Sequence, residues 1–176
     1  MAHQLHAITS AVIERAGVHD MMYPACPRCQ ASLQSALQQL SSDRRGVVCA
    51  ACETATARHA VPFRYRLKLQ VLFGSTVCDA MLFDEPAESL LGVSASRLRK
   101  LQSEYPSLLD VMEDLLLGLR VSFTYRSPES RASSAKYNRD LKISSIQPLT
   151  PSLLPRPLAR LALAYLSGQH EPHQDE

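Results

Sequence analysis

The chain has 176 residues, of which 45% are hydrophobic, so it is long enough for one domain with a substantial core and an attached subdomain. Lys and Arg number 19 against 17 Asp and Glu, and the resulting charge of +2 is too small to indicate nucleic-acid binding by itself. No run reaches the roughly 18 apolar residues of a membrane span, and the first ten residues lack a signal-peptide pattern, so we expect a soluble intracellular protein.

The N-terminal stretch Leu5 to Glu14 is rich in β-branched residues and stops before Gly17, which predicts a first strand. Two Cys-x-x-Cys pairs follow, formed by Cys26, Cys29, Cys49 and Cys52. This spacing is typical of a tetrahedral zinc site, and four thiolates leave no open position, so the zinc is expected to be structural. The alternatives are two disulfides or chance, and no signal peptide supports an oxidising compartment.

Two other possible metal ligands, His59 and Cys78, are not expected to bind the metal. His59 could replace a cysteine ligand, but four thiolates already fill the shell, so an exposed loop histidine is expected. Cys78 lies among apolar neighbours and is expected to be a small core residue. Between the cysteine pairs, leucines and alanines at helical spacing predict a helical or irregular finger over residues 30–48.

Strict alternation over residues 63–73 predicts the clearest strand, with one apolar and one basic face. Residues 76–83 predict a second strand with Phe83 facing outward. Asp84 is expected to cap a helix that ends at Gly92, and two further helices are expected at 94–101 and 107–117. Alternation returns at 119–125, a hairpin loop is expected at 127–138, and a last strand follows at 141–146. A mostly apolar helix begins at Leu158 and ends at Gly168.

Five strands with a helix between the third and fourth are the element order of an OB barrel. The predicted fold is therefore mainly β with helices: a five-stranded OB barrel with an inserted four-cysteine zinc ribbon and a C-terminal helix. The OB-fold domain is expected over residues 5–150, with the ribbon inserted at 23–60. A docking helix is expected at 151–168 and a disordered tail at 169–176.

Three stretches also carry a family resemblance: Tyr23-Pro24-Ala25-Cys26-Pro27, Phe63-Arg64-Tyr65-Arg66-Leu67, and the run from Leu82 to Gly92. In this order they resemble the C-terminal DNA-binding domain of the replication protein A large subunit, an OB fold with a zinc ribbon after its first strand. The resemblance runs from about His6 to Leu166. A related resemblance is to the C-terminal OB domain of shieldin complex subunit 2. Departures from the family pattern are a compact first cysteine pair, a longer finger and a Ser-rich last hairpin.

The resemblance implies single-stranded DNA binding in replication or repair, as end protection or strand coating, within a nuclear multi-subunit complex. A DNA strand needs cations for its phosphates and flat rings for its bases. The candidates are Arg64, Arg66, Lys68, Phe83, Arg120 and Arg126. The alternative is that basic outward faces only keep strands soluble and protect edges.

A second hypothesis is a protein-assembly module with little DNA binding of its own. The corresponding helix of the replication protein family joins a bundle with the smaller subunits, and the terminal helix here is apolar most of the way round. Its candidate partner-binding residues are Leu158, Leu161, Leu163, Tyr165 and Leu166. An enzyme is not expected, since no catalytic constellation or Gly-rich phosphate loop is present. Neither a membrane nor a small-molecule substrate is expected as a partner.

Overall fold

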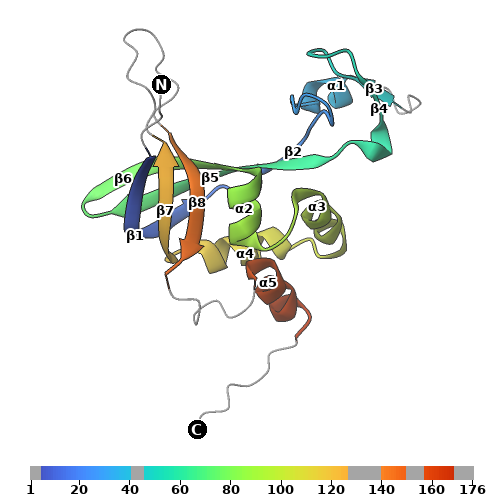
Figure 1. The fold of residues 1–176 in the computed structure, drawn as a ribbon. Helices are drawn as coiled ribbons and strands as arrows, with labels where there is room; N and C mark the ends of the chain where they lie inside the picture. The colour runs from blue at the N-terminus through green and yellow to red at the C-terminus, as the bar shows by residue number, and fades with distance from the viewer. Residues whose placement is uncertain (1–4, 41–45, 127–139, 150–156, 169–176) are drawn as a thin grey trace.

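A closed ring of five β-strands forms the centre of the molecule (Figure 1). The computed structural model describes residues 5–40, 46–126, 140–149 and 157–168. The strands are β1 (Leu5–Ala16), β5 (Phe63–Phe73), β6 (Thr76–Phe83), β7 (Arg120–Arg126) and β8 (Leu141–Pro148). Their order is β1-β7-β8-β6-β5, and β5 pairs back onto β1 to close the ring. Only β6 and β8 run parallel among these pairs, and the arrangement confirms the predicted OB barrel.

The alternation of side chains explains which face of each strand fills the barrel. In β5, Tyr65, Leu67, Leu69 and Val71 are buried, and Arg66 is among the exposed residues between them. The same pattern places apolar residues of β6, β7 and β8 inside, because neighbouring side chains on a strand point to opposite faces. The barrel interior is therefore an apolar core, and the described residues include no buried polar or charged side chain.

The ribbon, residues 23–60, projects from one end of the long strand β5 (Figure 1). The first residues of β5 pair with β2 (Met22–Pro24), whereas its later residues pair with β1. The ribbon also contains α1 (Gln34–Gln38), the hairpin β3 (Gly46–Val48) and β4 (Ala55–Ala57), and the short helix η1 (Arg58–Ala60). The predicted finger is thus helical over five residues. The ribbon has a small core separate from the barrel, made of Cys26, Leu33, Val47 and Cys49 together with Val61, which directly follows it.

Helices α2 (Asp84–Leu91), α3 (Ala95–Glu104) and α4 (Leu108–Leu116) lie between β6 and β7 in the chain, as predicted. They gather with α5 (Leu158–Leu166) on one side of the barrel (Figure 1). The predicted capping role of Asp84 is wrong. Phe83 occupies the N-cap position, and the carboxylate of Asp84 instead accepts hydrogen bonds from Arg64 and from the backbone N–H of Tyr65. Strand β6 runs directly into the helix, so Asp84 is already the first helical residue.

The structure tests some of the remaining sequence predictions, whereas others concern residues that it does not describe. Cys78 is half-buried and packs against the core. The predicted hairpin loop at 127–138 and the tail at 169–176 lie outside the described residues. No described helix is long and apolar enough to cross a membrane.

Gly92 and Gly74 provide a matched test of how α2 is tied to α5. Both have positive φ, 72° and 59°, so alanine at either site should cost about 1–2 kcal/mol of backbone strain. A Cβ at Gly74 would meet nothing within 4 Å, whereas one at Gly92 would overlap Pro157, which precedes α5. We expect Gly92→Ala to lower the free energy of unfolding by about 1–3 kcal/mol more than Gly74→Ala in urea denaturation. Equal losses would show that the Pro157 contact does not constrain α2.

Candidate nucleic-acid interface and metal centre

Four cysteines meet in the ribbon. The Sγ atoms of Cys26, Cys29, Cys49 and Cys52 all lie within 4.8 Å of one another. The Cys26 and Cys52 sulfurs are 3.5 Å apart, and the Cys29 and Cys49 sulfurs are 3.6 Å apart. A tetrahedral ion with metal–sulfur bonds of about 2.3 Å needs sulfur–sulfur edges of about 3.8 Å. The four thiols are free rather than paired as disulfides, so their arrangement fits a single metal ion.

The two cysteine pairs use the same backbone turn. The N–H of Gln30 donates to the carbonyl of Cys26 at 2.9 Å, and the N–H of Glu53 donates to the carbonyl of Cys49 at 2.8 Å. Gln30 and Glu53 both have positive φ, at 64° and 56°, which is unfavourable for residues with a Cβ. Each turn bends tightly enough to aim both sulfurs of its pair at one point, which is the geometry that a metal ion requires.

The thiols of the cluster differ in acidity. Hydrogen bonds with Thr54 lower the pKa of Cys52 to about 6, and its Sγ lies 3.2 Å from the Thr54 hydroxyl. Hydrogen bonds with the neighbouring thiols instead raise the pKa of Cys29 to about 12. The thiolate is the form that binds metal, so Thr54 favours the metal-binding form at Cys52 alone. His59 lies in η1, is exposed, and is not part of the cysteine cluster, as predicted.

Two of the predicted DNA-binding residues lie side by side on the barrel. Arg66 of β5 is the register partner of Phe83 of β6, so their side chains emerge on the same outer face. Phe83 is 38% exposed, which is a large value for a phenylalanine. The Arg66 guanidinium lies 5.8 Å from the centre of the Tyr23 ring. A cation and two rings are therefore presented together on this face.

Arg64 and Lys68 flank Arg66 but are engaged by carboxylates. The Arg64 Nε and Nη2 atoms lie 2.8 and 2.6 Å from Asp84 Oδ2, and this hydrogen bonding raises the pKa of Arg64. The Lys68 ammonium lies 3.0 Å from Asp79, whose hydrogen bond raises the pKa of Lys68. Both cations are partly neutralised before any phosphate arrives, and Arg64 also has a structural role at the start of α2.

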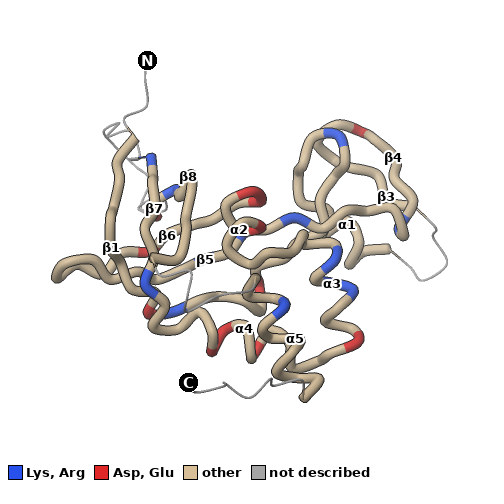
Figure 2. The backbone as a smooth tube through the Cα atoms, turned by 60° about the horizontal axis from the view of Figure 1, so that its bottom comes forward, with Lys and Arg blue, Asp and Glu red and all other residues tan. Residues whose placement is uncertain are grey.

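Arg120 and Arg126 lie at opposite ends of β7, roughly 20 Å apart at the rise of an extended strand. They therefore cannot both belong to one patch with Arg66. Arg126 pairs in register with Lys142 of β8, an exposed residue that the sequence analysis did not single out. Figure 2 shows basic positions at these neighbouring strand ends, whereas acidic positions gather on α2 and α4. The alternation of Lys142 with buried Ile143 could have identified it.

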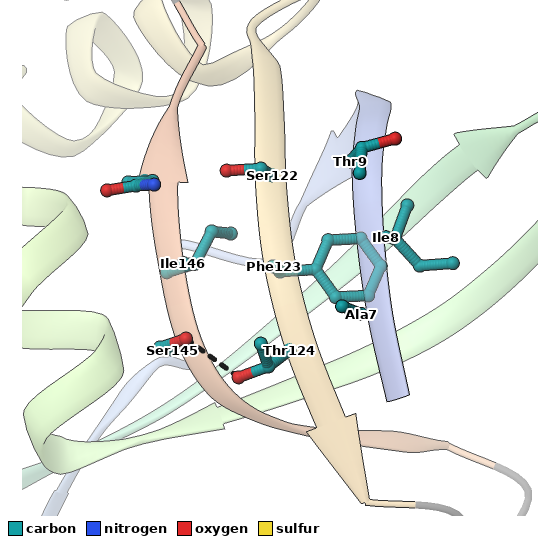
Figure 3. A pocket seen from close by; sticks show the side chains of 9 residues that line it. Ala7, Ile8, Thr9, Ser122, Phe123, Thr124, Ser145 and Ile146 are labelled. Carbon is teal, nitrogen blue, oxygen red and sulfur yellow. Dashed lines mark hydrogen bonds between the residues drawn. The ribbon is translucent and has the colours of Figure 1, made fainter. Parts of the chain in front are cut away.

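A shallow pocket of about 270 Å³ lies across β1, β7 and β8 (Figure 3). Its lining includes Thr9, Ser122, Thr124 and Ser145, and the last two hydroxyls are 2.7 Å apart. None of the described residues lining it is charged. This surface therefore offers a phosphate no cation, and it is a weaker candidate for a DNA strand than the face around Arg66.

The predicted partner-binding residues divide between two sides of α5. Leu158 is buried, and Leu163 and Leu166 pack against the same barrel core. Leu161 is half-buried, and Tyr165 is 59% exposed. Packing within the chain accounts for Leu158, Leu163 and Leu166, whereas Leu161 and Tyr165 are not part of that core.

Comparisons with known proteins agree with this geometry. Residues 6–150 match the model of the replication factor-A C-terminal domain family. Among solved structures, a replication protein A heterotrimer bound to single-stranded DNA aligns with a TM-score of 0.64 at 18% identity, covering 96% of this chain and 36% of that one. Yeast replication protein A bound to single-stranded DNA aligns with a TM-score of 0.62 at 21% identity, covering 97% of this chain and 88% of that one.

These structural likenesses establish the fold. The chain spans about a third of the length of the first of these structures. A comparison with curated protein sequences finds no match. The family match covers the barrel and the ribbon together, including all four cysteines and the Arg66–Phe83 face, so the chain belongs to the replication factor-A C-terminal domain family.

Proposed function

We propose that this chain is a single-stranded DNA-binding OB module that acts in DNA replication or repair in the nucleus, within a multi-subunit complex. The observation that carries the proposal is the outward pairing of Arg66 with Phe83 on neighbouring strands. Its support from relatives is that both aligned replication protein A structures are bound to single-stranded DNA. Its role is binding, either coating a strand or protecting a DNA end, and no catalytic step is assigned to it.

On this face, a cation and an aromatic ring can bind different parts of a DNA strand. A guanidinium attracts phosphates and can form two parallel hydrogen bonds to one of them. An exposed ring stacks any base, at about 1–3 kcal/mol per base, because every base has a π-face. Arg66 supplies the cation and Phe83 the ring, while Arg126 and Lys142 extend the positive potential over β7 and β8. Arg64, Lys68 and Arg120 make smaller contributions, since the first two are ion-paired and the third lies apart.

We also propose that the four cysteines bind one structural zinc ion. Thiolate ligands at tetrahedral spacing favour zinc over Mg²⁺ or Ca²⁺, which prefer oxygen. Four ligands close the coordination shell, so the ion supplies folding energy and no Lewis acid chemistry.

Purified protein should contain one zinc per chain, measured by elemental analysis. Because the ribbon core is small and structural zinc contributes on the order of 10 kcal/mol, chelation or Cys49→Ser should unfold the ribbon while the barrel persists. Limited proteolysis would then cut within 23–60 and spare β6 to β8. Cys78→Ser serves as the control, since this cysteine packs against the barrel core and is not part of the four-cysteine cluster. Disulfides among the four thiols with well under one zinc per chain would contradict the assignment.

Phe83→Ala should weaken binding of an oligothymidine by about 1–3 kcal/mol without changing the slope of affinity against salt. Arg66→Glu should weaken binding and also lower that slope by about 0.7 for the phosphate contact it loses. Arg97→Glu, an exposed arginine on α3 away from this face, is the control. Fluorescence anisotropy at several salt concentrations gives both quantities. Unchanged binding by both Arg66→Glu and Phe83→Ala would show that this face does not bind DNA and is only a solvated surface.

A second candidate function is protein assembly through α5, favoured by the 59% exposure of Tyr165 and the partial exposure of Leu161 one turn earlier. These two residues fit an apolar helix of a partner subunit.

Leu161→Glu combined with Tyr165→Glu should lower the melting temperature less than Leu163→Glu does, and should abolish association with the smaller replication protein A subunits in sedimentation velocity. Arg160→Glu on the same helix is the control. Leu163→Glu should destabilise the domain instead, because Leu163 packs against the main hydrophobic core. Association that survives the double substitution would remove the docking role.

A further inference from the structure

A groove of about 530 Å³ lies between α3 and α5, which run side by side on the helical side of the molecule (Figure 2). Helix α5 packs mainly on α4, and α3 packs mainly on β5, so other elements hold the two helices and the space between them stays open. The described residues that line it include neither Leu161 nor Tyr165, nor any candidate DNA-binding residue. The groove is therefore a surface that the two proposed functions leave unused.

The two helices begin at the same end of the groove. A Cβ on Gly92, three residues before α3, would overlap Pro157, which directly precedes α5. The third residue of each helix lines the groove, followed by the residues four and seven positions later, at 97, 101 and 104 and at 160, 164 and 167. Residues at this spacing share one face of a helix. The two lining faces therefore advance together from one end of the groove to the other.

The groove changes character along its length. At the end where both helices begin, Arg97 and Arg160 are exposed. The lining then becomes apolar and half-buried, and exposed polar side chains return only at the far end. The apolar residues are Leu101, Tyr105, Leu163 and Ala164, and the polar ones are Glu104 and Ser167. A ligand that fits this groove combines an apolar face with negative charge at one end.

The two arginines have no carboxylate partner within the described part of the chain, where the ion pairs involve His19, Arg64 and Lys68 instead. Glu104 lies seven residues from Arg97, roughly 10 Å along α3, which is too far for an ion pair. Two unpaired guanidinium groups at one end of a groove attract carboxylates, to which arginine can donate two parallel hydrogen bonds.

From this arrangement we infer that the α3–α5 groove binds an acidic amphipathic helix of a partner protein. Carboxylates of the partner contact Arg97 and Arg160, and its apolar residues at helical spacing pack on Leu101 and Leu163. The lining of α3 rises by roughly 10 Å, so the groove accommodates about two turns of a bound helix. An interface of this length is small, so the interaction is weak and reversible.

A nucleic acid matches the groove less well. Tyr105 carries the one aromatic ring among the described lining residues, and it is half-buried against the main core, so it offers no open face to a base. Glu104 would repel a phosphate backbone that ran along the whole groove. The binding site inferred here is thus independent of the DNA-binding face around Arg66 and Phe83.

The test selects ligands by their chemistry. Random peptides of about 14 residues, enough for roughly four helical turns, are displayed on phage and selected on the full chain. We expect the enriched peptides to combine several Asp or Glu with apolar residues at helical spacing. A fluorescein-labelled copy of the most enriched peptide is then titrated by fluorescence anisotropy. Arg97→Glu combined with Arg160→Glu should weaken its binding about tenfold or more, because two attractions become repulsions.

Two further variants separate the groove from charge alone. Ala164→Trp fills the apolar middle and leaves both arginines in place, so it should also weaken binding of the peptide. Lys100→Glu combined with Arg15→Glu makes the same change in net charge at exposed positions outside the groove, and this matched control should bind the peptide as the unmodified chain does. Thermal melting checks that each variant is folded.

The double variant Arg97→Glu, Arg160→Glu should keep its affinity for oligothymidine and its association with the smaller replication protein A subunits. Retained binding of the peptide by this variant, or enrichment of peptides without acidic residues, would overturn the inference. Loss of oligothymidine binding by the variant would assign the arginines to DNA and overturn it as well. Loss of subunit association would assign the groove to subunit assembly, with the same consequence.

Discussion

The alternation and length of β5 are the constraint on which the other parts depend. Its inward residues fill the barrel, and its two ends pair with different partners, β2 at the start and β1 toward the end. A register slip of one residue would turn Arg66 and Lys68 into the core and expose Leu67. Burial of the apolar face therefore determines which side chains point outward. The cations of β5 are exposed to solvent as a consequence of core packing. The same strand also carries the ribbon, so one stretch of backbone positions both the barrel face and the ribbon.

The junction after β6 is held by a polar contact that local sequence rules did not predict. Asp84 has φ of 37°, an unfavourable value for a residue with a Cβ, and its carboxylate is bonded to Arg64 and to the N–H of Tyr65. Local helix-capping rules assign such an aspartate to its own helix, but here the acceptor serves the neighbouring strand. The contact gives Arg64 a structural role at the start of α2, whereas Phe83 points outward because it alternates with buried Leu82.

Sequence periodicity predicted the elements whose signal is local. The bounds of β5 and β6 match the predicted ranges, and the end of α2 at Gly92 follows from a left-handed C-cap that glycine adopts readily. The order of strands and helix was then enough for the OB barrel. Contacts between distant segments could not be predicted, because no period in the chain encodes that Arg97 and Arg160 line one groove. For the same reason the sequence could not show which side of α5 packs within the domain, since an apolar residue such as Leu163 can face the core or a partner.

The small core of the ribbon gives a physical reason for the proposed metal ion. Five buried residues, two of them cysteines, bury too little apolar surface to order a segment of about 40 residues, because fixing each residue costs about 1–2 kcal/mol. The turns at Gln30 and Glu53 add strain from positive φ. Coordination of four thiolates can offset both costs. Such an ion would also order α1 and η1, so the part of the chain least able to fold by itself is the part whose folding would depend on the metal.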